Sequence, residues 1–273
     1  MFTPQEESRS NHGKNRPDPA QDTAENQQEQ RDQQEQQTPR TPQAKKALFV
    51  VTAADTWTLK DGEKHPTGFW GEELAVPHKI FTEAGWHVTI ATPGGVAPTV
   101  DQLSLGLAGG SPRKRKMVRE YLVAIDAQLK TPTPLEQINH EDFDLVFYPG
   151  GHGPMEDLAY DETSGALLAS RVASDQPLAL LCHGPAAILA AGAKGENPFA
   201  GRKMTALSNK EEKLNIFGWK AQWYLEDALT EAGVEFSAGF PLRPNVVVDG
   251  NLYTGQNPQS SEKLAQRLIE DLS

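Results

Sequence analysis

The sequence Cys-His-Gly at positions 182–184 contains the only cysteine of this 273-residue chain. The apolar run at residues 177–181 is typical of a strand, and Pro185 is a favourable first residue of a helix. So short a turn holds a residue in a strained conformation and exposes its side chain above the sheet, as in a nucleophile elbow. The start of a helix also favours a thiolate. We therefore interpret Cys182 as a catalytic or redox-active nucleophile and not as a small packed hydrophobic residue.

Two backbone N–H groups are candidates for an oxyanion site near this sulfur. Addition of a thiolate to a carbonyl places negative charge on oxygen, which N–H groups aimed at that oxygen can stabilise. One candidate is the N–H of His183, and the other is that of Gly151 in the sequence Gly-Gly-His-Gly at residues 150–153. The glycines are also typical of a tight turn that needs positive φ, and the two interpretations are compatible.

A thiolate also needs a partner that accepts or supplies a proton. His183 follows the cysteine directly, and Glu73 could face the sulfur from a helix that starts with Glu72 and Glu73. A carboxylate beside a thiolate has a raised pKa, so Glu73 could share a proton with the thiol. An acidic first turn that complements the helix dipole is the alternative for this pair, and spacing alone leaves both open. A third acid, Glu211 or Glu212, could orient the imidazole of His183.

The elements around these residues alternate between strand and helix patterns. Runs typical of strands cover residues 45–53, 86–95, 143–148, 177–181, 201–208, 235–239 and 246–255, and helical patterns cover 71–85, 112–129, 164–176, 185–192, 223–233 and 261–272. Short crossovers of this kind indicate parallel strands. We predict a three-layer α/β/α sandwich with a flavodoxin-like, mostly parallel sheet. Ligands bind beyond the carboxyl ends of such strands, where the segments with Glu73, Gly151 and Cys182 converge.

Composition divides the chain into two parts. Residues 1–44 are polar and rich in Gln and Glu, so we expect a disordered tail, because they bury too little apolar surface to offset the entropy of ordering. Residues 45–273 are expected to form one catalytic domain. The net charge of −11 argues against nucleic acid as the main partner. A single cysteine fits a reducing compartment, so we expect a cytoplasmic protein, and no apolar stretch reaches the length of a membrane span.

Four separated motifs resemble the ThiJ/PfpI superfamily. They are TGFWGEELAVP at residues 67–77, YPGGHGPMEDL at 148–158, CHGP at 182–185 and DGNLYTGQNPQSS at 249–261. Within that superfamily, which has the class I glutamine amidotransferase-like fold, they are similar to the branch of glutathione-independent glyoxalase III and heat-shock chaperones. The resemblance covers nearly all of the chain from about residue 46 onward.

The resemblance implies a role for each candidate residue. Cys182 would be the nucleophile, with His183 beside it and Glu73 as the proton carrier. Glu212 would complete the triad, with Glu211 as the fallback. The oxyanion N–H groups would belong to Gly151 and His183. Larger bacterial members of the branch hold a metal between two histidines and a carboxylate, a set that we do not match here, so we predict no metal. Four further histidines are expected to be surface or packed residues: His65, His78, His87 and His140.

The activity that the branch implies needs no cofactor. It converts 2-oxoaldehydes such as methylglyoxal to 2-hydroxy acids such as D-lactate, through a hemithioacetal on Cys182, a proton transfer from C1 to C2 by Glu73 or His183, and hydrolysis of a thioester. Deglycation of methylglyoxal adducts on proteins or nucleotides is also implied, as is a homodimer. The expected partners are thus small reactive aldehydes, without nucleic acid or membrane.

Three other functions are compatible with the same fold. A cysteine peptidase or amidase could use the elbow and the histidine, but it has no need of Glu73 beside the sulfur. A stress-inducible holdase chaperone would depend on exposed apolar patches and not on Cys182. In an oxidation sensor, Cys182 would form a stable sulfinate beside Glu73.

Overall fold

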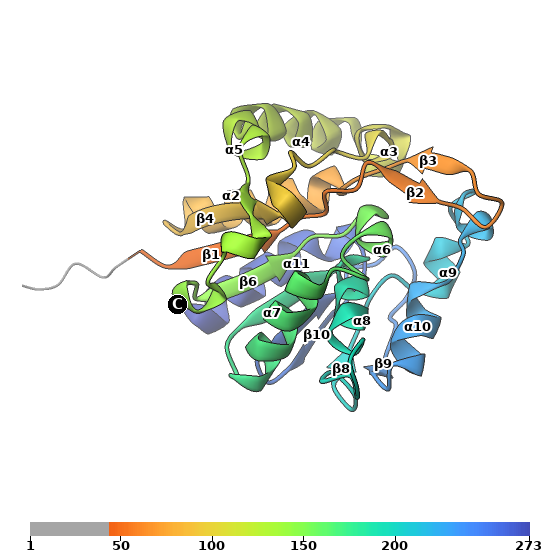
Figure 1. The fold of residues 1–273 in the computed structure, drawn as a ribbon. Coiled ribbons are helices and arrows are strands. Elements are labelled where there is room, and N and C mark those ends of the chain that lie inside the picture. The colour runs from red at the N-terminus through yellow and green to blue at the C-terminus, as the bar shows by residue number, and fades with distance from the viewer. Residues whose placement is uncertain (1–43) are drawn as a thin grey trace, which may run out of the picture. The chain divides into compact units, whose positions relative to one another are not determined.

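The computed structural model describes residues 44–273, so the predicted tail, residues 1–44, lies outside the described residues except for Ala44. A seven-stranded sheet with the order β10-β11-β7-β6-β1-β4-β5 forms the centre of the described part (Figure 1). Its strands are β1 (Lys46–Val50), β4 (His87–Thr92), β5 (Thr133–Pro134), β6 (Leu145–Tyr148), β7 (Leu178–Leu181), β10 (Val246–Asp249) and β11 (Leu252–Gly255). Every neighbouring pair is parallel except β10 and β11, which confirms the predicted mostly parallel sheet.

Both faces of the central strands are buried. Successive residues of a strand point to opposite faces, and in β1 Leu48 and Val50 join one apolar cluster while Ala47 and Phe49 join the other. Every residue of β6 and β7 is buried as well. Burial on both faces explains why the sequence shows continuous apolar runs at these strands and no alternation.

Helices cover each face of the sheet (Figure 1). The cluster that contains Phe49 also contains residues of α2 (Gly71–Glu83), α4 (Pro112–Ala124) and α11 (Ser261–Leu272). The cluster that contains Leu48 includes residues of α7 (Glu162–Ala173), α8 (Ile188–Ala191) and α10 (Leu225–Glu231). The remaining α-helices are α3 (Gln102–Leu105), α5 (Asp126–Lys130), α6 (Gly153–Glu156) and α9 (Asn209–Glu212). This arrangement confirms the predicted three-layer α/β/α sandwich. No helix among residues 44–273 combines the length and the apolar character that a membrane crossing needs.

Several elements differ from the prediction in extent or partner. The helix predicted at 112–129 is two helices, α4 and α5, because Ile125 between them has φ −102° and ψ 12°. The strand predicted at 201–208 is reduced to β8 (Lys203–Met204), which pairs with β9 (Glu235–Phe236) in a separate two-stranded sheet. An apolar run does not reveal which strand a segment will pair with, so this placement follows from tertiary packing.

Other short elements were not expected from the sequence. An antiparallel hairpin of β2 (Thr56–Thr58) and β3 (Lys64–Pro66) lies in the polar stretch before α2. The helix predicted at 185–192 begins as a 3-10 turn. The 3-10 turns of the described part are Pro93–Gly95, Leu107–Gly109, Leu135–Gln137, His140–Asp142, Gly184–Ala187, Gly218–Lys220 and Pro258–Ser260.

Candidate active site

Cys182 lies directly after β7 in a strained conformation. Its φ is +59°, in the left-handed region that residues other than glycine rarely adopt. Its N–H donates to the carbonyl of Gly255 at 2.8 Å, and its carbonyl accepts from the N–H of Leu207 at 3.0 Å. Only glycine fits at position 184, because a Cβ there would lie 2.5 Å from the carbonyl oxygen of Tyr148. The surrounding backbone therefore maintains the strain, and the predicted elbow is present at the carboxyl end of the sheet.

Glu73 is fully buried in the first turn of α2. Its Oε2 accepts a hydrogen bond of 2.8 Å from the N–H of Gly150, whereas its Oε1 has no hydrogen-bond partner among residues 44–273. Burial raises the pKa of this carboxyl well above its usual value, and the Cys182 side chain next to it lowers that pKa only in part. Burial also raises the pKa of the Cys182 thiol, and the negative charge of Glu73 raises it further. Two adjacent groups that both resist a negative charge retain a proton between them.

His183 connects the sulfur to a carboxylate. Its Nδ1 lies 3.5 Å from Sγ of Cys182, and its Nε2 lies 2.6 Å from Oε2 of Glu212 in α9. Burial lowers the pKa of His183, and the Glu212 carboxylate counters this only in part. The structure thus brings Cys182, His183 and Glu212 together in the order of a catalytic triad.

Glu211, the fallback for the third acid, has a different set of contacts. Its carboxylate accepts hydrogen bonds from the side chains of Gln256 at 2.7 Å and Asn257 at 2.8 Å, and from the N–H of Leu242 at 2.9 Å. It also forms a capping box with Ser208 at the start of α9. Glu211 therefore holds three segments together, and its hydrogen bonds go to these segments and not to the imidazole of His183.

His152 is a site residue that sequence analysis did not single out. Its Nε2 lies 2.9 Å from Oε1 of Glu212, and its ring stacks on that of Trp57 with the centroids 4.1 Å apart. Burial opposes a charge on this imidazole, but the Glu212 carboxylate raises the pKa of His152 above its usual value. The two histidines together hold the pKa of the Glu212 carboxyl below its usual range despite its burial. The sequence signal that could have identified His152 was its position in the glycine turn after β6, one residue after Gly151.

His152, His183 and Glu212 also form a group of metal-ligand type. Their ligand atoms all lie within 4.8 Å of one another, and all three side chains are buried. Sequence analysis matched no such set, because the histidines and the carboxylate are far apart in the sequence. Each Nε2 already contacts one carboxylate oxygen, so these polar atoms satisfy one another as they stand.

The glycine turn after β6 packs against the elbow. A Cβ at Gly150 would lie 2.6 Å from the backbone nitrogen of His183 and 2.8 Å from Oε2 of Glu73. Gly151 has φ +103°, and a Cβ there would lie 2.4 Å from the carbonyl oxygen of Gly68. Among residues 44–273, the N–H groups of Gly151 and His183 donate to no backbone acceptor. The two predicted oxyanion donors therefore belong to segments in contact, and both residues line one cavity.

This cavity has a volume of about 530 Å³ and opens over the cysteine. Its lining includes Cys182, His183, Glu212 and His152, whereas the fully buried Glu73 is not among the lining residues. The other lining residues are Trp70, Leu103, Ala108, Gly151, Leu207, Glu211, Leu214, Asn215, Ile216, Phe217, Leu242, Asn257, Pro258 and Gln259.

The four other histidines among residues 44–273 are surface or packed residues, as predicted. His78 is buried, with its ring nitrogens 2.9 Å from the Tyr121 hydroxyl and 3.1 Å from Oε1 of Gln128. The ring of His65 stacks on that of Phe217, His87 is exposed, and His140 is half-buried.

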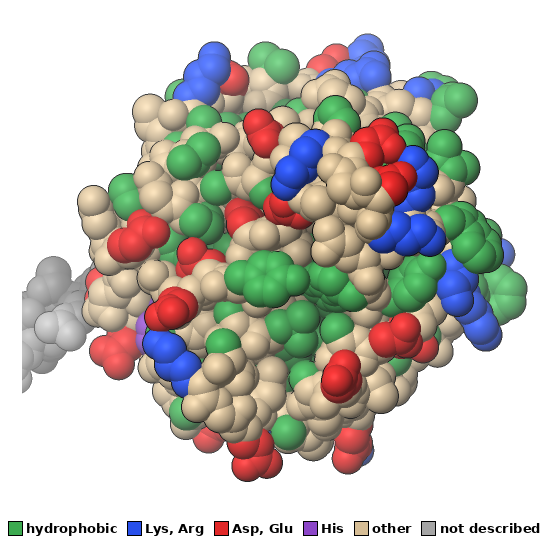
Figure 2. Space-filling model, turned by 45° about the vertical axis from the view of Figure 1, so that its right-hand side comes forward, with side chains coloured by type: hydrophobic (Ala, Val, Ile, Leu, Met, Phe, Trp, Pro, Cys, Tyr) green, Lys and Arg blue, Asp and Glu red, His purple; other side chains and the backbone are tan. Residues whose placement is uncertain are grey.

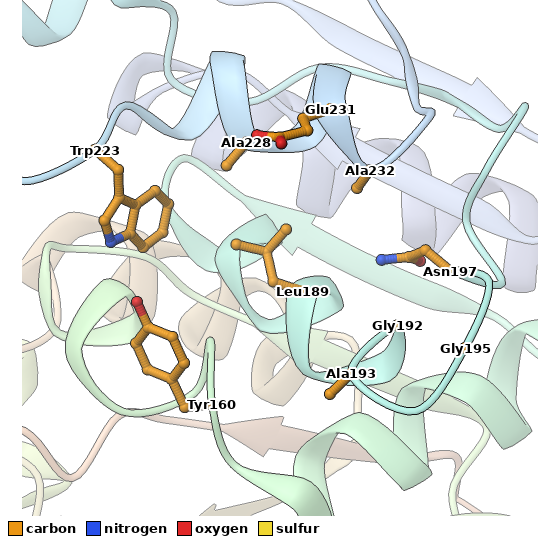
Figure 3. A pocket seen from close by; sticks show the side chains of 10 residues that line it. All are labelled: Tyr160, Leu189, Gly192, Ala193, Gly195, Asn197, Trp223, Ala228, Glu231 and Ala232. Carbon is orange, nitrogen blue, oxygen red and sulfur yellow. The ribbon is translucent and has the colours of Figure 1, made fainter.

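A second cavity, of about 520 Å³, shares no lining residue with the first (Figure 3). Side chains from α8, α10 and neighbouring loops surround it, with the rings of Tyr160 and Trp223 at one end and Asn197 at the other. It contains no cysteine or histidine and no candidate residue of the sequence analysis.

The fold and this site define a class of α/β proteins that carry a cysteine at a nucleophile elbow, in contact with a histidine and a buried glutamate. Residues 66–271 match the DJ-1/PfpI family, and the chain belongs to that family. The resemblance to the ThiJ/PfpI superfamily is thereby confirmed.

Several relatives are similar over most of their length. The glutathione-independent glyoxalase hsp3101 of Schizosaccharomyces pombe is 28% identical over 216 residues, which cover 75% of this chain and 87% of the relative. The protein/nucleic acid deglycase HchA of Staphylococcus aureus is 26% identical over 239 residues, which cover 83% of this chain and 80% of HchA. The solved structure of the Rapid Encystment Protein 24 kDa of Francisella tularensis is 26% identical, has a TM-score of 0.74, and matches 84% of this chain and 99% of that one.

Proposed function

We propose that this protein is a glutathione-independent glyoxalase that converts methylglyoxal and other 2-oxoaldehydes to 2-hydroxy acids, D-lactate in the case of methylglyoxal, without a cofactor. The observation that carries the proposal is the buried carboxyl of Glu73 beside the side chain of Cys182, where burial raises the pKa of both groups. An isomerisation that moves a proton between neighbouring carbons needs such a carrier beside the nucleophile. The name of the Schizosaccharomyces pombe relative supports the same reaction.

In the first step the Cys182 thiolate adds to the aldehyde carbon C1, and the electron pair of the carbonyl bond moves to oxygen. The N–H groups of Gly151 and His183 would stabilise that oxyanion. Glu73 gives its proton to the oxygen, which completes a hemithioacetal and leaves Glu73 as a carboxylate.

In the second step the Glu73 carboxylate removes the proton from C1, and the electron pair forms an enediolate with C2. Return of this proton to C2, together with transfer of the hydroxyl proton on C1 to the oxygen on C2, gives the thioester of a 2-hydroxy acid on Cys182. Water then cleaves the thioester, with the neutral imidazole of His183 as the base and Glu212 orienting it. The acid leaves, the sulfur of Cys182 departs as the thiolate, and the proton that His183 took from water returns to Glu73.

Lactate formation from methylglyoxal without glutathione tests the proposal. We expect turnover by the wild type and none by Cys182→Ala or Glu73→Gln. Glu72→Gln is the matched control, because Glu72 is the neighbouring buried glutamate and pairs with Lys114 at 2.7 Å, away from the sulfur. Absence of lactate with the wild type would refute the activity, and loss of turnover in all three variants would refute the specific role of Glu73.

Deglycation of methylglyoxal adducts on proteins is a second activity that the same thiolate chemistry would permit, and the name of the Staphylococcus aureus relative supports it. That name also includes nucleic acid, so our expectation that nucleic acid is not a partner of this chain stays a prediction. Release of free lysine or arginine side chains from a glycated peptide, after correction for free methylglyoxal, would separate deglycation from the glyoxalase reaction.

A holdase chaperone is the second candidate function, and exposed apolar side chains favour it. Hydrophobic side chains gather in a band across the face in Figure 2. The most exposed large apolar residues of the described part are Leu107, Phe240, Ile216, Val123 and Tyr160. Suppression of aggregation of a heat-denatured client by Cys182→Ala, at the wild-type level, would support this function independently of the glyoxalase.

We also propose that the protein acts in the cytoplasm as a homodimer. A reducing compartment suits a function that needs the thiol of Cys182 unoxidised. Light scattering of the purified protein measures the oligomeric state, and a monomer at micromolar concentration would refute the dimer.

A further inference from the structure

The cavity over Cys182 has two chemically different zones. Its floor carries the reacting groups, Cys182, His183 and Glu212, which are all at least 97% buried. Its walls and rim are mostly apolar, with Trp70, Leu103, Leu207, Leu214, Ile216, Phe217, Leu242 and Pro258. No lysine or arginine is among the lining residues, whereas two carboxylates are. A substrate with a carboxylate or a phosphate would find no lysine or arginine there, and His152 is already paired with Glu212.

The size of the cavity exceeds the needs of methylglyoxal, which carries a single methyl group beside its two carbonyls. A volume of about 530 Å³ lies in the range of sites for drug-sized ligands, roughly 300–1,000 Å³. A small aldehyde bound to the sulfur would leave the rim unoccupied. Ile216 and Leu242 on that rim are 76% and 56% exposed, and exposed apolar side chains at a cavity mouth are typical of a binding surface.

The backbone at Leu242 is strained, which places an apolar side chain at the rim at a cost in stability. Its φ is +58°. Leu242 is one of three non-glycine residues with positive φ among residues 44–273, and the nucleophile Cys182 is another. The N–H of Leu242 donates to Oε1 of Glu211, whose carboxylate is also held by Asn257. Strain of this kind persists where surrounding contacts maintain it, commonly at ligand-binding sites.

Contacts on both sides of Ile216 order a second part of the cavity lining. The ring of Phe217 stacks on His65 with centroids 3.7 Å apart. The indole nitrogen of Trp219 donates to the carbonyl of Lys213 at 3.0 Å, across the loop that carries Ile216. Gly218 allows a close approach of this loop to α9, since a Cβ there would lie 2.0 Å from the carbonyl oxygen of Glu212. The rim is therefore joined to the element that carries the triad acid.

On the basis of the proposed function, we infer that the preferred substrates are 2-oxoaldehydes with a bulky, neutral, apolar substituent such as an aromatic ring. Ile216 and Leu242 are the specificity-determining residues, which contact that substituent while C1 lies at the sulfur of Cys182. The reaction steps are unchanged, and the rim acts only on the part of the substrate that does not react.

The test compares phenylglyoxal with methylglyoxal as substrates of the wild type, Ile216→Ser and Leu242→Asn. Asn tolerates positive φ and keeps the N–H that Glu211 binds, so Leu242→Asn removes apolar surface and little else. Val123→Ser is the matched control, since Val123 is 76% exposed, like Ile216, and does not line the cavity. The measured quantity is kcat/KM for phenylglyoxal divided by kcat/KM for methylglyoxal. Each variant's ratio is compared with that of the wild type, so that the difference in intrinsic reactivity between the two aldehydes cancels.

We expect each rim variant to lower this ratio at least about threefold, given that one methylene in an apolar pocket is worth about tenfold or more, and Val123→Ser to leave it unchanged. An unchanged ratio in both rim variants would overturn the inference. A loss of kcat/KM that is equal for both aldehydes would overturn it as well, because the rim would then not act on the substituent.

Alkylation of the single cysteine tests the rim even if neither aldehyde is turned over. The sulfur adds to the double bond of a maleimide, which takes up a proton on the neighbouring carbon, and mass spectrometry follows the adduct. We expect N-phenylmaleimide to react faster with Cys182 than N-methylmaleimide does, relative to their rates with free cysteine, and each rim variant to reduce this preference. If the preference for N-phenylmaleimide is present but the protein forms neither lactate from methylglyoxal nor mandelate from phenylglyoxal, the glyoxalase proposal fails and the inference about the rim stands. If turnover occurs but the two maleimides alkylate Cys182 at equal relative rates in the wild type and in every variant, the inference about the rim fails and the glyoxalase proposal stands.

Discussion

Nε2 of His152 lies 2.9 Å from Oε1 of Glu212, on the carboxylate oxygen that His183 does not use. The single carboxylate thus bridges two buried imidazoles, one of which faces the nucleophile. Since Glu212 raises the pKa of His152 while burial lowers that of His183, this arrangement favours a positive charge on His152 over one on His183. A neutral His183 that donates Nε2–H to Glu212 has a free Nδ1 lone pair directed to the sulfur, the state that a base requires.

Replacement of His152 should therefore impair turnover without abolishing it. In His152→Ala the buried Oε1 of Glu212 loses its partner, and the orientation of His183 loosens. We expect kcat to fall about 10- to 100-fold, as for other residues that orient a reacting group, with His152→Asn less affected because it keeps a donor. Steady-state lactate formation measures this, and thermal unfolding checks the fold. Wild-type kcat in His152→Ala would contradict a positioning role.

The pH dependence of thiol alkylation should show the coupling between Cys182 and Glu73. In the wild type both pKa values are raised, so the pair loses its two protons in separate steps, and the thiolate is fully formed only after the second. In Glu73→Gln the negative neighbour is absent, so we expect one step, at lower pH than the upper wild-type step. Iodoacetamide reaction rates followed by mass spectrometry give both profiles. A step that moves to higher pH in the variant would show that Glu73 does not oppose the thiolate.

Glu73→Gln should also stabilise the fold at neutral pH. The folded-state pKa of Glu73 lies above its unfolded value, so its contribution to stability is present below the unfolded pKa and is lost as pH rises through the folded pKa. A neutral amide avoids this loss, keeps an acceptor for the Gly150 N–H, and lets its NH2 group occupy the position of the unpartnered Oε1. We expect Tm to rise by about 2–4 °C near pH 8, equivalent to about 1 kcal/mol, and the difference from wild type to vanish near pH 4. If the wild type and Glu73→Gln have equal Tm values near pH 8 as well as near pH 4, burial of the Glu73 carboxylate is not unfavourable.

Gly151→Ala should disturb the oxyanion donors, and Gly85→Ala provides the matched control. Both glycines have positive φ, +103° and +84°, but only at Gly151 would a Cβ meet backbone atoms, whereas at Gly85 nothing lies within 4 Å. We expect both variants to lose stability, by about 1–2 kcal/mol for the left-handed backbone alone. Only Gly151→Ala should lower kcat, by about 100-fold, as for the loss of one oxyanion donor. Equal kcat values for the two variants in the lactate assay would argue against Gly151 N–H as a donor.

Local sequence was sufficient for the central sheet and for the elbow. A strand buried on both faces appears as a continuous apolar run, and β1, β6 and β7 lie where such runs occur. The strand, the Cys-His-Gly turn and the proline that follows are contiguous, so the strained position of Cys182 follows from neighbours in the chain. The same holds for Glu73, which lies in the first turn of a helix that the apolar spacing predicts.

Tertiary structure decided which distant side chains meet. Glu211 and Glu212 are adjacent in one short helix, and successive residues of an α-helix point about 100° apart, so one binds Asn257 while the other binds His183. Sequence spacing cannot assign these directions, because they depend on how α9 lies against the sheet. His152 meets Glu212 from 60 positions away, and the apolar rim joins segments near residues 103, 216 and 242. Contacts between segments so far apart exist only once the chain is folded, which is why local sequence could not assign the contact of His152 with Glu212 or the composition of the rim.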